Sequence, residues 1–425
     1  GSKWQAGEQK NDLGAIFEAR AKNWKSLDYV AGWFMKAADY GTRTSTVAAF
    51  VATNSICQGQ QVPILWPLIF RTGHEIKFAH TSFKWANLAS HKAGVTVVIV
   101  GISNHPGKLR QLFSSADNDA SIVKDVENIN AYLVPGENVE VEGRTKPLTD
   151  VTEMQFGNHP YYGAPLIFSS DEAHSIVAQA PVAERYIRPL YGSREFISAS
   201  PRCCLWIFES DLADAMQVPQ IASKIEAVAA ARRAATQDKT AQKLADTPYR
   251  FREQVTARER ALIVPRVSSE NRPYLPIGLL EPRCVIQEKA FALYDAPIWN
   301  LALIASRLHW VWIATVCSRL RTDFSYSNTL GWNTFPVPTL TDKNRDDLTR
   351  CAEDILLARE AHFPATIADL YDPDAMPDDL REAHERNDEV LERIYIGRRF
   401  RNDTERLEKL FELYTKMTAK KGAAR

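Results

Sequence analysis

The sequence predicts an α/β fold in its first part, followed by an α+β region and an α-helical C-terminal region. Over the first hundred or so residues, segments with helical periodicity alternate with segments of strand character, which is typical of a layered α/β sheet. From residue 129 onward, short strand-like pieces are separated by Pro, Gly and Asn. After residue 338, amphipathic and highly charged helical segments continue to the end. We therefore expect three domains, at 1–128, 129–338 and 339–425.

Length and composition are those of an ordinary globular protein. A chain of 425 residues is too long for one compact core. Its 52 basic and 52 acidic residues give a formal net charge of zero, which excludes a histone-like polycation but not a local basic patch. No run of apolar residues is long enough to cross a bilayer, because Asn300, Arg307 and His309 interrupt the most apolar stretch, 296–320. That stretch is expected to be a buried core helix, and no membrane partner is expected.

The six cysteines are scattered, and no pair has the CxxC spacing of a zinc site. We expect reduced thiols in a cytoplasmic protein and no metal site. The adjacent Cys203 and Cys204 are expected in the core, with a redox role as the weaker alternative. His80 and His309 lie in apolar surroundings and are expected to be hydrogen-bonded core groups rather than ligands.

The elements of the first region follow one another closely. The predicted order is a helix at 26–40, a buried strand at 44–54, a helix at 58–73, and strands at 74–83 and 93–102. The region begins on a helix and has no GxGxxG turn, which a doubly wound nucleotide-binding domain needs early. This order therefore resembles the second half of such a domain.

The later elements are less regular. Residues 103–134 are predicted to form a polar connection. Residues 218–260 are predicted to be helical and basic, and residues 261–280 are predicted to form two strands joined by a polar turn.

Polar and aromatic residues gather where two predicted strands end. Thr53 and Asn54 follow one strand, and Phe83, Lys84 and Trp85 end the next. In an α/β enzyme, functional groups collect at the carboxyl ends of strands, so these residues are a candidate site. The alternative is an ordinary polar strand end beside core aromatics, and the residues alone favour that alternative.

Two further patterns suggest binding of a polyanion. The basic segment contains four conspicuous cations, namely Arg232, Arg233, Lys239 and Lys243. The alternative is a solvated helical face. In "PRVSSENRPYLP", Glu270 and Arg272 would project to the same side of an extended strand, where Glu can accept from cytosine and Arg can bind guanine. The alternative is a surface ion pair, which composition alone favours.

Several long motifs resemble those of the MmeI-like family, the type II restriction-modification proteins that methylate adenine N6 in DNA. The first region resembles that family's later catalytic motifs through "SLDYVAGWFMKAADY", "AAFVATNSICQGQQVPILWPLIF" and "EIKFAHTSFKWANLASHKAGVTVVIVG". The remainder resembles its target-recognition and C-terminal regions through "INAYLVPG", "RCCLWI", "RRAATQDKTAQKLADTPYRF", "VPRVSSENRPYLPIG", "RTDFSYSNTLGWNTFPVP" and "LREAHERNDEVLERIY".

The resemblance implies a fold and a cofactor. Residues 1–128 would be the C-terminal half of a class I (Rossmann-like) methyltransferase sheet, 129–338 the target-recognition domain and 339–425 a helical domain. The cofactor would be S-adenosylmethionine, whose glycine-rich motif is absent from these residues, as is the catalytic Asn-Pro-Pro-Tyr/Phe motif. "GSKWQAGEQK" resembles the sequence that follows the catalytic motif, so we expect a fragment that begins there, with Gly1-Ser2 either native or a cloning remnant.

The resemblance also assigns roles. Phe83, with Trp85 as second choice, would stack on a flipped adenine, Lys84 would hold a phosphate, and Thr53 and Asn54 would line the pocket. In the recognition region, Glu270 and Arg272 would read bases. Backbone or base contacts are expected from Arg232, Arg233, Lys239 and Lys243. Arg321 and Tyr326 would either contact DNA or fasten a helix to the core.

The expected partner is double-stranded DNA, in a bacterial cytoplasmic restriction-modification or phage-defence system. A polypeptide carrying the cofactor and catalytic motifs is a second expected partner. One alternative is a non-catalytic DNA-specificity module, or a subunit that another polypeptide completes. A further alternative is an RNA methyltransferase.

Overall fold

The computed structural model describes residues 2–85, 95–115, 121–320 and 323–422. The chain forms two compact units, each assembled from separate stretches. The first unit contains Gly1–Asp150, Arg307–Thr339 and Glu392–Arg425, and the second contains Val151–Ser306 and Leu340–Leu391. Because these units gather distant stretches of chain, they do not test the expected boundaries of the three domains, which stay a prediction.

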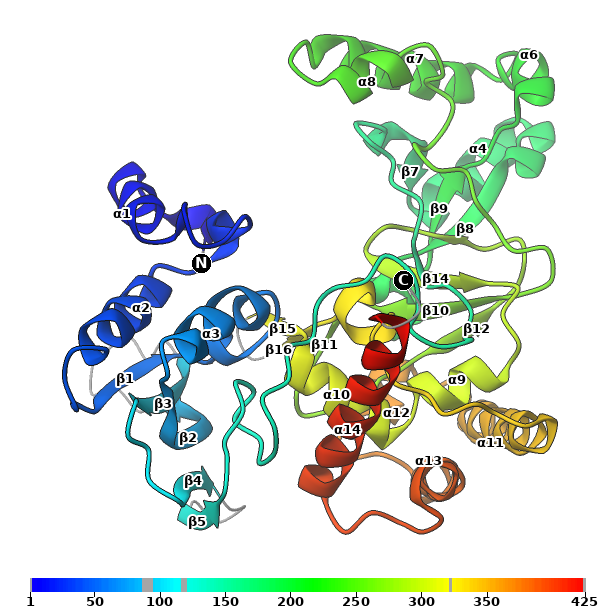
Figure 1. Ribbon diagram of the computed structural model, residues 1–425. Coiled ribbons are helices and arrows are strands. Elements are labelled where there is room, and N and C mark those ends of the chain that lie inside the picture. Colours follow the sequence, from blue (N-terminus) through cyan, green and yellow to red (C-terminus); the bar gives the residue numbers. More distant parts are fainter. Residues whose placement is uncertain (1, 86–94, 116–120, 321–322, 423–425) are drawn as a thin grey trace. The chain divides into compact units, whose positions relative to one another are not determined.

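The first unit contains a five-stranded sheet in the order β1-β3-β2-β4-β5 (Figure 1). Its strands are β1 (Ala48–Thr53), β2 (Glu75–Trp85), β3 (Val95–Ser103), β4 (Arg110–Ser115) and β5 (Ser121–Val126). β3 is antiparallel to both β1 and β2, so β1 and β2 are parallel to each other with β3 between them. β4 is parallel to β2, and β5 is antiparallel to β4. The predicted α/β combination of helices with a sheet is confirmed here, and the sheet is mixed, because among its described strands only the pairing of β2 with β4 is parallel.

Helices α1 (Gly7–Phe17), α2 (Val30–Gly41) and α3 (Gln61–Arg71) accompany this sheet. Phe34 of α2 contacts Phe50 of β1 and Trp66 of α3, with ring centroids 4.6 Å and 5.9 Å away. The Trp66 indole donates to the carbonyl of Ile56 at 2.8 Å, so this buried nitrogen is satisfied. The predicted helices at 26–40 and 58–73 are confirmed, as are the strands at 74–83 and 93–102.

Two expectations for this region are wrong. The strand at 44–54 is not fully buried, because β1 is an edge strand whose side chains alternate, and Val51 is 50% exposed. The connection at 103–134 contains β4 and β5, which pair from Arg110↔Val126 to Ser115↔Ser121. The apolar residues of these strands are few and adjacent, Leu112-Phe113 and Ile122-Val123, so no alternating pattern marked the strands.

The rest of the first unit is built around two helices, α10 (Arg307–Val316) and α14 (Asp403–Gly422), with the short strands β15 (Ser318–Leu320) and β16 (Asp323–Ser325). Trp312 of α10 lies 5.4 Å from Phe411 and 5.9 Å from Tyr414 of α14, between ring centroids. The expected burial within 296–320 is confirmed by Trp312 and Ile313, which have no exposed surface, but the single helix expected there is wrong, because the segment forms two helices, Trp299–Ile304 and Arg307–Val316, followed by β15. Among the described helices, none has the length and hydropathy of a membrane span.

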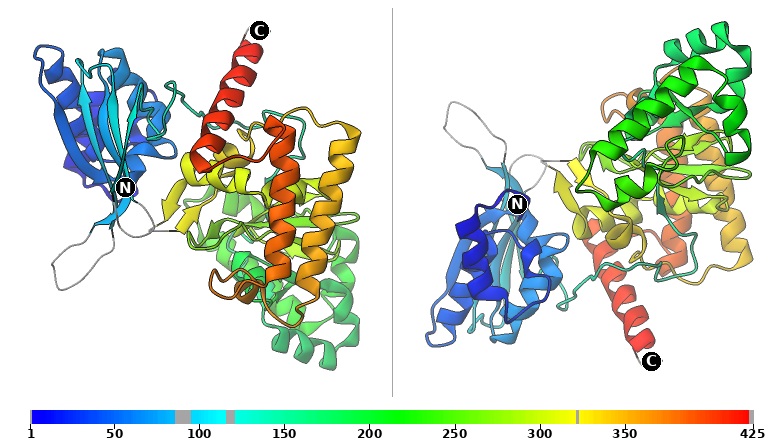
Figure 2. Two further views of the ribbon diagram at one scale, coloured as in Figure 1. Left: turned by 90° about the horizontal axis from the view of Figure 1, so that it is seen from below. Right: turned by 90° about the horizontal axis from the view of Figure 1, so that it is seen from above.

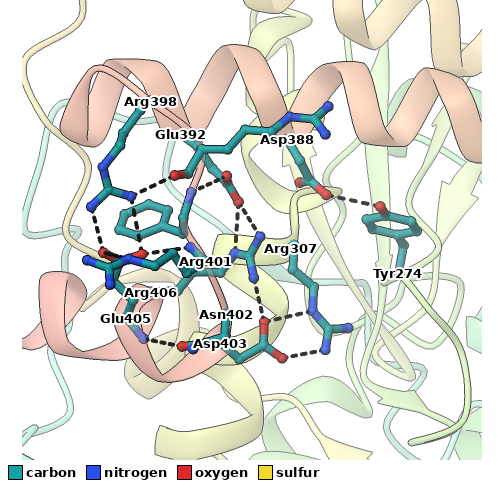
Figure 3. A network of polar contacts seen from close by, with 12 residues as sticks. Tyr274, Arg307, Asp388, Glu392, Arg398, Arg401, Asn402, Asp403, Glu405 and Arg406 are labelled. Atoms are coloured by element: carbon teal, nitrogen blue, oxygen red, sulfur yellow. Dashed lines mark hydrogen bonds and ion pairs between the residues drawn. The ribbon is translucent and has the colours of Figure 1, made fainter.

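Ion pairs join α14 to its neighbours in the first unit (Figure 3). Arg307 of α10 and Arg406 of α14 both bind Asp403, at 2.5 Å and 2.9 Å. Arg406 also binds Glu392, which is 2% exposed, at 2.5 Å. Glu392 in addition accepts from the backbone N–H of Phe400 at 2.8 Å. These contacts satisfy a buried carboxylate that would otherwise destabilise the fold.

The second unit contains two four-stranded sheets, in the orders β12-β10-β14-β6 and β13-β8-β9-β7. Its strands are β6 (Gln155–Phe156), β7 (Ile167–Phe168), β8 (Ile187–Tyr191), β9 (Arg202–Leu205), β10 (Ala261–Pro265), β11 (Val267–Ser268), β12 (Gly278–Leu280), β13 (Val285–Ile286) and β14 (Ala290–Tyr294). Its helices are α4 (Ser170–Gln179), α5 (Ser193–Ile197), α6 (Leu212–Ala215), α7 (Pro219–Ala234), α8 (Lys239–Leu244), α9 (Trp299–Ile304), α11 (Asp342–Glu360), α12 (Ile367–Leu370) and most of α13 (Asp378–Ile396).

The apolar side of α7 packs on the second of these sheets. Ile221 and Val228 of α7 share a core with Tyr186, Trp206 and Phe251. Helices α11 and α13 lie side by side (Figure 2), with Arg386 of α13 3.9 Å from Asp354 of α11. The predicted helical C-terminal region is confirmed.

The structure refines three further expectations. The segment 218–260 is helical only in α7 and α8, because residues 245–260 form turns and irregular structure. The two strands expected at 261–280 are confirmed by β10 and β12, which pair from Ala261↔Leu280. Cys203 and Cys204 are free thiols on β9, and Cys204 is fully buried in the core, as expected.

Candidate functional site

The register of the sheet brings Thr53 and Phe83 into one cross-strand row. Thr53 of β1 pairs with Val97 of β3, and Val97 pairs with Phe83 of β2 on its other side. Paired residues in a sheet project from the same face, and neighbouring strands are roughly 4.8 Å apart. Thr53 and Phe83 therefore lie on one face at the carboxyl ends of two parallel strands. We call these three residues the Phe83 row.

A β-bulge determines the direction of Phe83. His80 pairs with Ile99 and Phe83 with Val97, so β2 has one residue more than β3 over this interval. In a regular strand, His80 and Phe83 would project from opposite faces, because they are three residues apart. The bulge places them on the same face. Thr81 and Ser82, which form the bulge, were not predicted from the sequence. The signal was present, because two polar residues in succession interrupt the alternation of the strand.

Aromatic rings surround Phe83 on this face. The rings of His80 and Trp85 lie 6.4 Å and 6.2 Å from that of Phe83, between centroids. His80 also stacks on Phe113 of β4 at 4.3 Å, with the planes 9° apart, and burial lowers the pKa of His80. Phe83 is half-buried and Trp85 is 43% exposed. The group therefore offers a partly accessible aromatic surface on the same face of the sheet as Thr53, which is two strands away.

The other two residues expected at this site lie differently. Lys84 pairs with Thr96 and projects from the face opposite to Phe83. Asn54 is 6% exposed and lines a cavity of about 850 Å³ together with Gln58, Thr81 and Ser82, whereas Phe83 is not among the residues lining it. Within the described part of the chain, the Asn54 Nδ2 atom has no hydrogen-bond partner. The structure thus groups Thr53 with Phe83 and Trp85, and separates Lys84 and Asn54 from them.

Arg232, expected to contact DNA, is instead a buried framework residue. It has no exposed surface, and its five N–H groups donate to five backbone carbonyls. The acceptors belong to Pro160, Tyr161, Leu244, Thr247 and Arg250, at 2.7–3.0 Å. Burial lowers the pKa of the guanidinium to about 10, so it is still charged at neutral pH. With every donor engaged, Arg232 has none left for a phosphate, and this part of the expectation is wrong.

Arg233, Lys239 and Lys243 remain candidates for DNA contacts, because all three side chains are exposed. The geometry assumed for Glu270 and Arg272 is wrong. They lie on a turn between β11 and β12 rather than in an extended strand, and the Arg272 N–H donates to the Ser269 carbonyl at 3.3 Å. Strand alternation therefore does not set their direction, and their role as base readers stays a prediction.

Two residues were expected either to contact DNA or to fasten a helix. Arg321 lies outside the described residues. Tyr326 is 4% exposed, and its hydroxyl lies 2.9 Å from Nε2 of His309, which is fully buried on α10. Burial lowers the pKa of His309 to about 3 and raises that of Tyr326, so both groups are neutral. The geometry favours the fastening role for Tyr326 and agrees with the core role expected for His309.

No cluster of His, Cys, Asp and Glu side chains suited to a metal occurs among the described residues.

Comparison with known proteins gives consistent matches along the chain. Models of the DNA-methyltransferase, target recognition and C-terminal domains of MmeI match residues 1–114, 135–339 and 340–421. The chain is 40% identical over 418 residues to DNA methyltransferase A of Bacillus subtilis (strain 168), covering 98% of this chain and 47% of that protein.

A solved structure agrees with these matches. The type IIL restriction-modification enzyme MmeI in complex with DNA superposes with a TM-score of 0.88 and 32% identity, covering 99% of this chain and 56% of that one. The chain thus spans about half the length of each of these two relatives. From the three domain matches and the similarity of fold, we conclude that this chain belongs to the MmeI-like family.

Proposed function

We propose that this chain is the base-flipping and sequence-recognition part of an enzyme that transfers a methyl group from S-adenosylmethionine to adenine N6 in duplex DNA. The observation that carries this proposal is the Phe83 row, in which a bulge directs a partly accessible aromatic ring to the face and level of Thr53. An enzyme that modifies a base in a duplex must take that base out of the stack. The partly accessible Phe83 ring, near the carboxyl end of β2, is suited to receive that base.

Phe83 would act by stacking. Unpairing a base costs a few kcal/mol, and stacking on an aromatic side chain returns roughly 1–3 kcal/mol. The neighbouring rings of His80 and Trp85 limit the rotation of Phe83 and so reduce the entropy lost on binding. The hydroxyl of Thr53, on the same face, would contact the base or its sugar. Restriction-modification or phage defence is the proposed setting.

These 425 residues do not supply a cofactor site of the expected kind. They contain neither a GxGxxG turn nor an Asn-Pro-Pro-Tyr/Phe motif. We therefore assign no step involving the cofactor to these residues.

A second candidate function follows from the absence of these two motifs from the 425 residues. β1 is at the edge of its sheet, and Val47 and Val51 on or beside it are 46% and 50% exposed. An apolar edge strand is a template for pairing with another strand. The chain would then be a DNA-specificity subunit, completed by a polypeptide that brings the cofactor and catalytic motifs.

A methyl-transfer assay tests both candidates. Labelled S-adenosylmethionine and unmethylated duplex DNA are added to the chain alone, and to the chain mixed with the N-terminal half of the Bacillus subtilis relative. We expect label in N6-methyladenine only in the mixture. Label with the chain alone would refute the subunit hypothesis, and label in another base would refute the adenine assignment. A parallel arm with RNA tests the alternative of an RNA methyltransferase.

A further inference from the structure

The backbone of the second unit is unusual at two consecutive tyrosines. Tyr161 and Tyr162 have φ values of +46° and +62°, in the left-handed region that bulky L-residues rarely occupy. Such backbone conformations persist only where the surrounding structure enforces them, and they concentrate at functional sites. We call residues 159–163 the tyrosine corner, a name for this segment alone and unrelated to the tyrosine corner of immunoglobulin-like domains.

Arg232 and Gly163 hold the corner from inside. The buried guanidinium of Arg232 donates to the carbonyls of Pro160 and Tyr161, each at 3.0 Å. The N–H of Gly163 donates to the Pro160 carbonyl at 3.0 Å, and a Cβ at Gly163 would lie only 2.5 Å from that oxygen. The corner is therefore rigid, and Arg232, one of the cations of the basic segment, holds its backbone.

The two tyrosines have different surroundings. The Tyr161 hydroxyl donates to Asp238 at 2.9 Å, and the guanidinium of Arg252 lies 5.4 Å from the Tyr161 ring centroid. Tyr162 is 50% exposed, with its ring 5.7 Å from that of Tyr161. Tyr161 is thus engaged in the framework, whereas half of the Tyr162 surface is accessible.

Exposed cations lie at and next to the ends of the chain segment that lines the hollow with Tyr162. Tyr162 lines a hollow of about 460 Å³ together with residues 234–239, the connection from α7 to α8. Arg233 precedes this connection, Lys239 ends it, and Lys243 follows on α8, all with exposed side chains. The one carboxylate in the hollow, Asp238, accepts from the N–H groups of Thr240 and Ala241 and from Tyr161, so its charge is spread over several donors.

We propose that the tyrosine corner is a DNA-contacting element in which the Tyr162 ring packs against a sugar or base, while Arg233 and Lys239 bind the flanking phosphates. A rigid aromatic between cations is suited to duplex DNA, because the ring gains contact area at little entropic cost and the cations release counterions. The inference rests on the proposed function, since it requires that this chain binds DNA. It adds a contact at a place in the recognition region where the sequence motifs indicated only charge.

The test uses the full chain and a fluorescently labelled random-sequence duplex, with Kd measured over a series of salt concentrations. Tyr162→Asn removes the ring and keeps a residue that tolerates the left-handed backbone. We expect Kd to rise about 10-fold, equivalent to about 1.4 kcal/mol, with an unchanged salt dependence because no charge is lost. Lys239→Ala should instead lower the slope of log Kd against log salt by about 0.9.

Controls separate a contact from a structural effect. Tyr162→Phe keeps the ring and should keep the affinity, and Val182→Asn, which removes another exposed apolar group of the second unit, should change nothing. If Tyr162→Asn loses its melting transition, Tyr162→Gly takes its place, since Gly adopts this backbone most easily. Wild-type affinity in a folded ring-deficient variant would overturn the inference alone. Absence of DNA binding by the wild-type chain would overturn the proposed function.

Discussion

The Phe83 row and the tyrosine corner both present an accessible aromatic ring on an irregular backbone, but different interactions hold them. In the row, one extra residue in a hydrogen-bonded ladder turns Phe83 to its face, and no charged group is required. In the corner, a buried cation bound to five carbonyls holds the backbone of Tyr161. The row therefore depends on register and the corner on one side chain, so point mutations should affect the two very differently.

The largest effect is expected at the corner. Arg232→Met should remove five hydrogen bonds to backbone carbonyls and lower the free energy of unfolding by about 3–5 kcal/mol. Arg233→Met is the matched control, because this neighbouring arginine is exposed and should change stability by less than about 0.5 kcal/mol. Urea denaturation followed by circular dichroism measures both variants. Equal stabilities of the two variants would show that the corner does not depend on Arg232.

A smaller effect, on activity rather than stability, is expected at the row. In the completed enzyme, Phe83→Ala should lower kcat/KM for methylation about 5- to 150-fold, the equivalent of losing roughly 1–3 kcal/mol of stacking. Trp85→Ala should cost less, since Trp85 lies beyond Phe83 at the end of the strand. Steady-state rates and DNA affinity are measured together, because a stacking role affects the rate more than the binding. An unchanged rate for Phe83→Ala would remove the assignment of the row.

The sequence predicted most of the sheet but not its irregularities. The strands at β2 and β3 and the helices at α2 and α3 have strong periodicity and clear end signals, such as Gly59 and Gly73. The β4–β5 hairpin was missed because its strands are short and polar. Thr81 and Ser82 interrupt the alternation within β2, but the bulge itself depends on pairing with β3, which lies elsewhere in the sequence.

The candidate residues show what sequence can and cannot distinguish. Arg232 and Arg233 are adjacent and identical in type, yet one is fully buried and the other exposed, because they point to different sides of α7. The helix has a weak apolar face, rich in alanine, so the inward direction of Arg232 was not readable. Tyr161 and Tyr162 gave no signal either, since their left-handed backbone is imposed by Arg232 and Gly163 rather than by their own preference.

The buried contact between His309 and Tyr326 tests whether neutral groups can hold a segment as the charged Arg232 does. Tyr326→Phe should leave Nε2 of His309 without this partner and lower the free energy of unfolding by about 1–3 kcal/mol at pH 7, with DNA affinity unchanged. A loss of affinity in a stable Tyr326→Phe variant would instead support a DNA contact.

The acid stability of the same contact gives the last expected effect, which appears only below about pH 6.5. His309 has a folded-state pKa of about 3 and an ordinary value of 6.5, so between these values the unfolded chain binds the extra proton. Stability should therefore fall as the pH drops below about 6.5 towards about 3. In the double variant His309→Phe/Tyr326→Phe this contribution is absent, and its stability should fall less steeply than that of the wild type over the same range. Denaturation at a series of pH values measures the difference in slope, and parallel curves would mean that the pKa of His309 is the same in the folded and unfolded chains, so that the fold does not hold this histidine neutral.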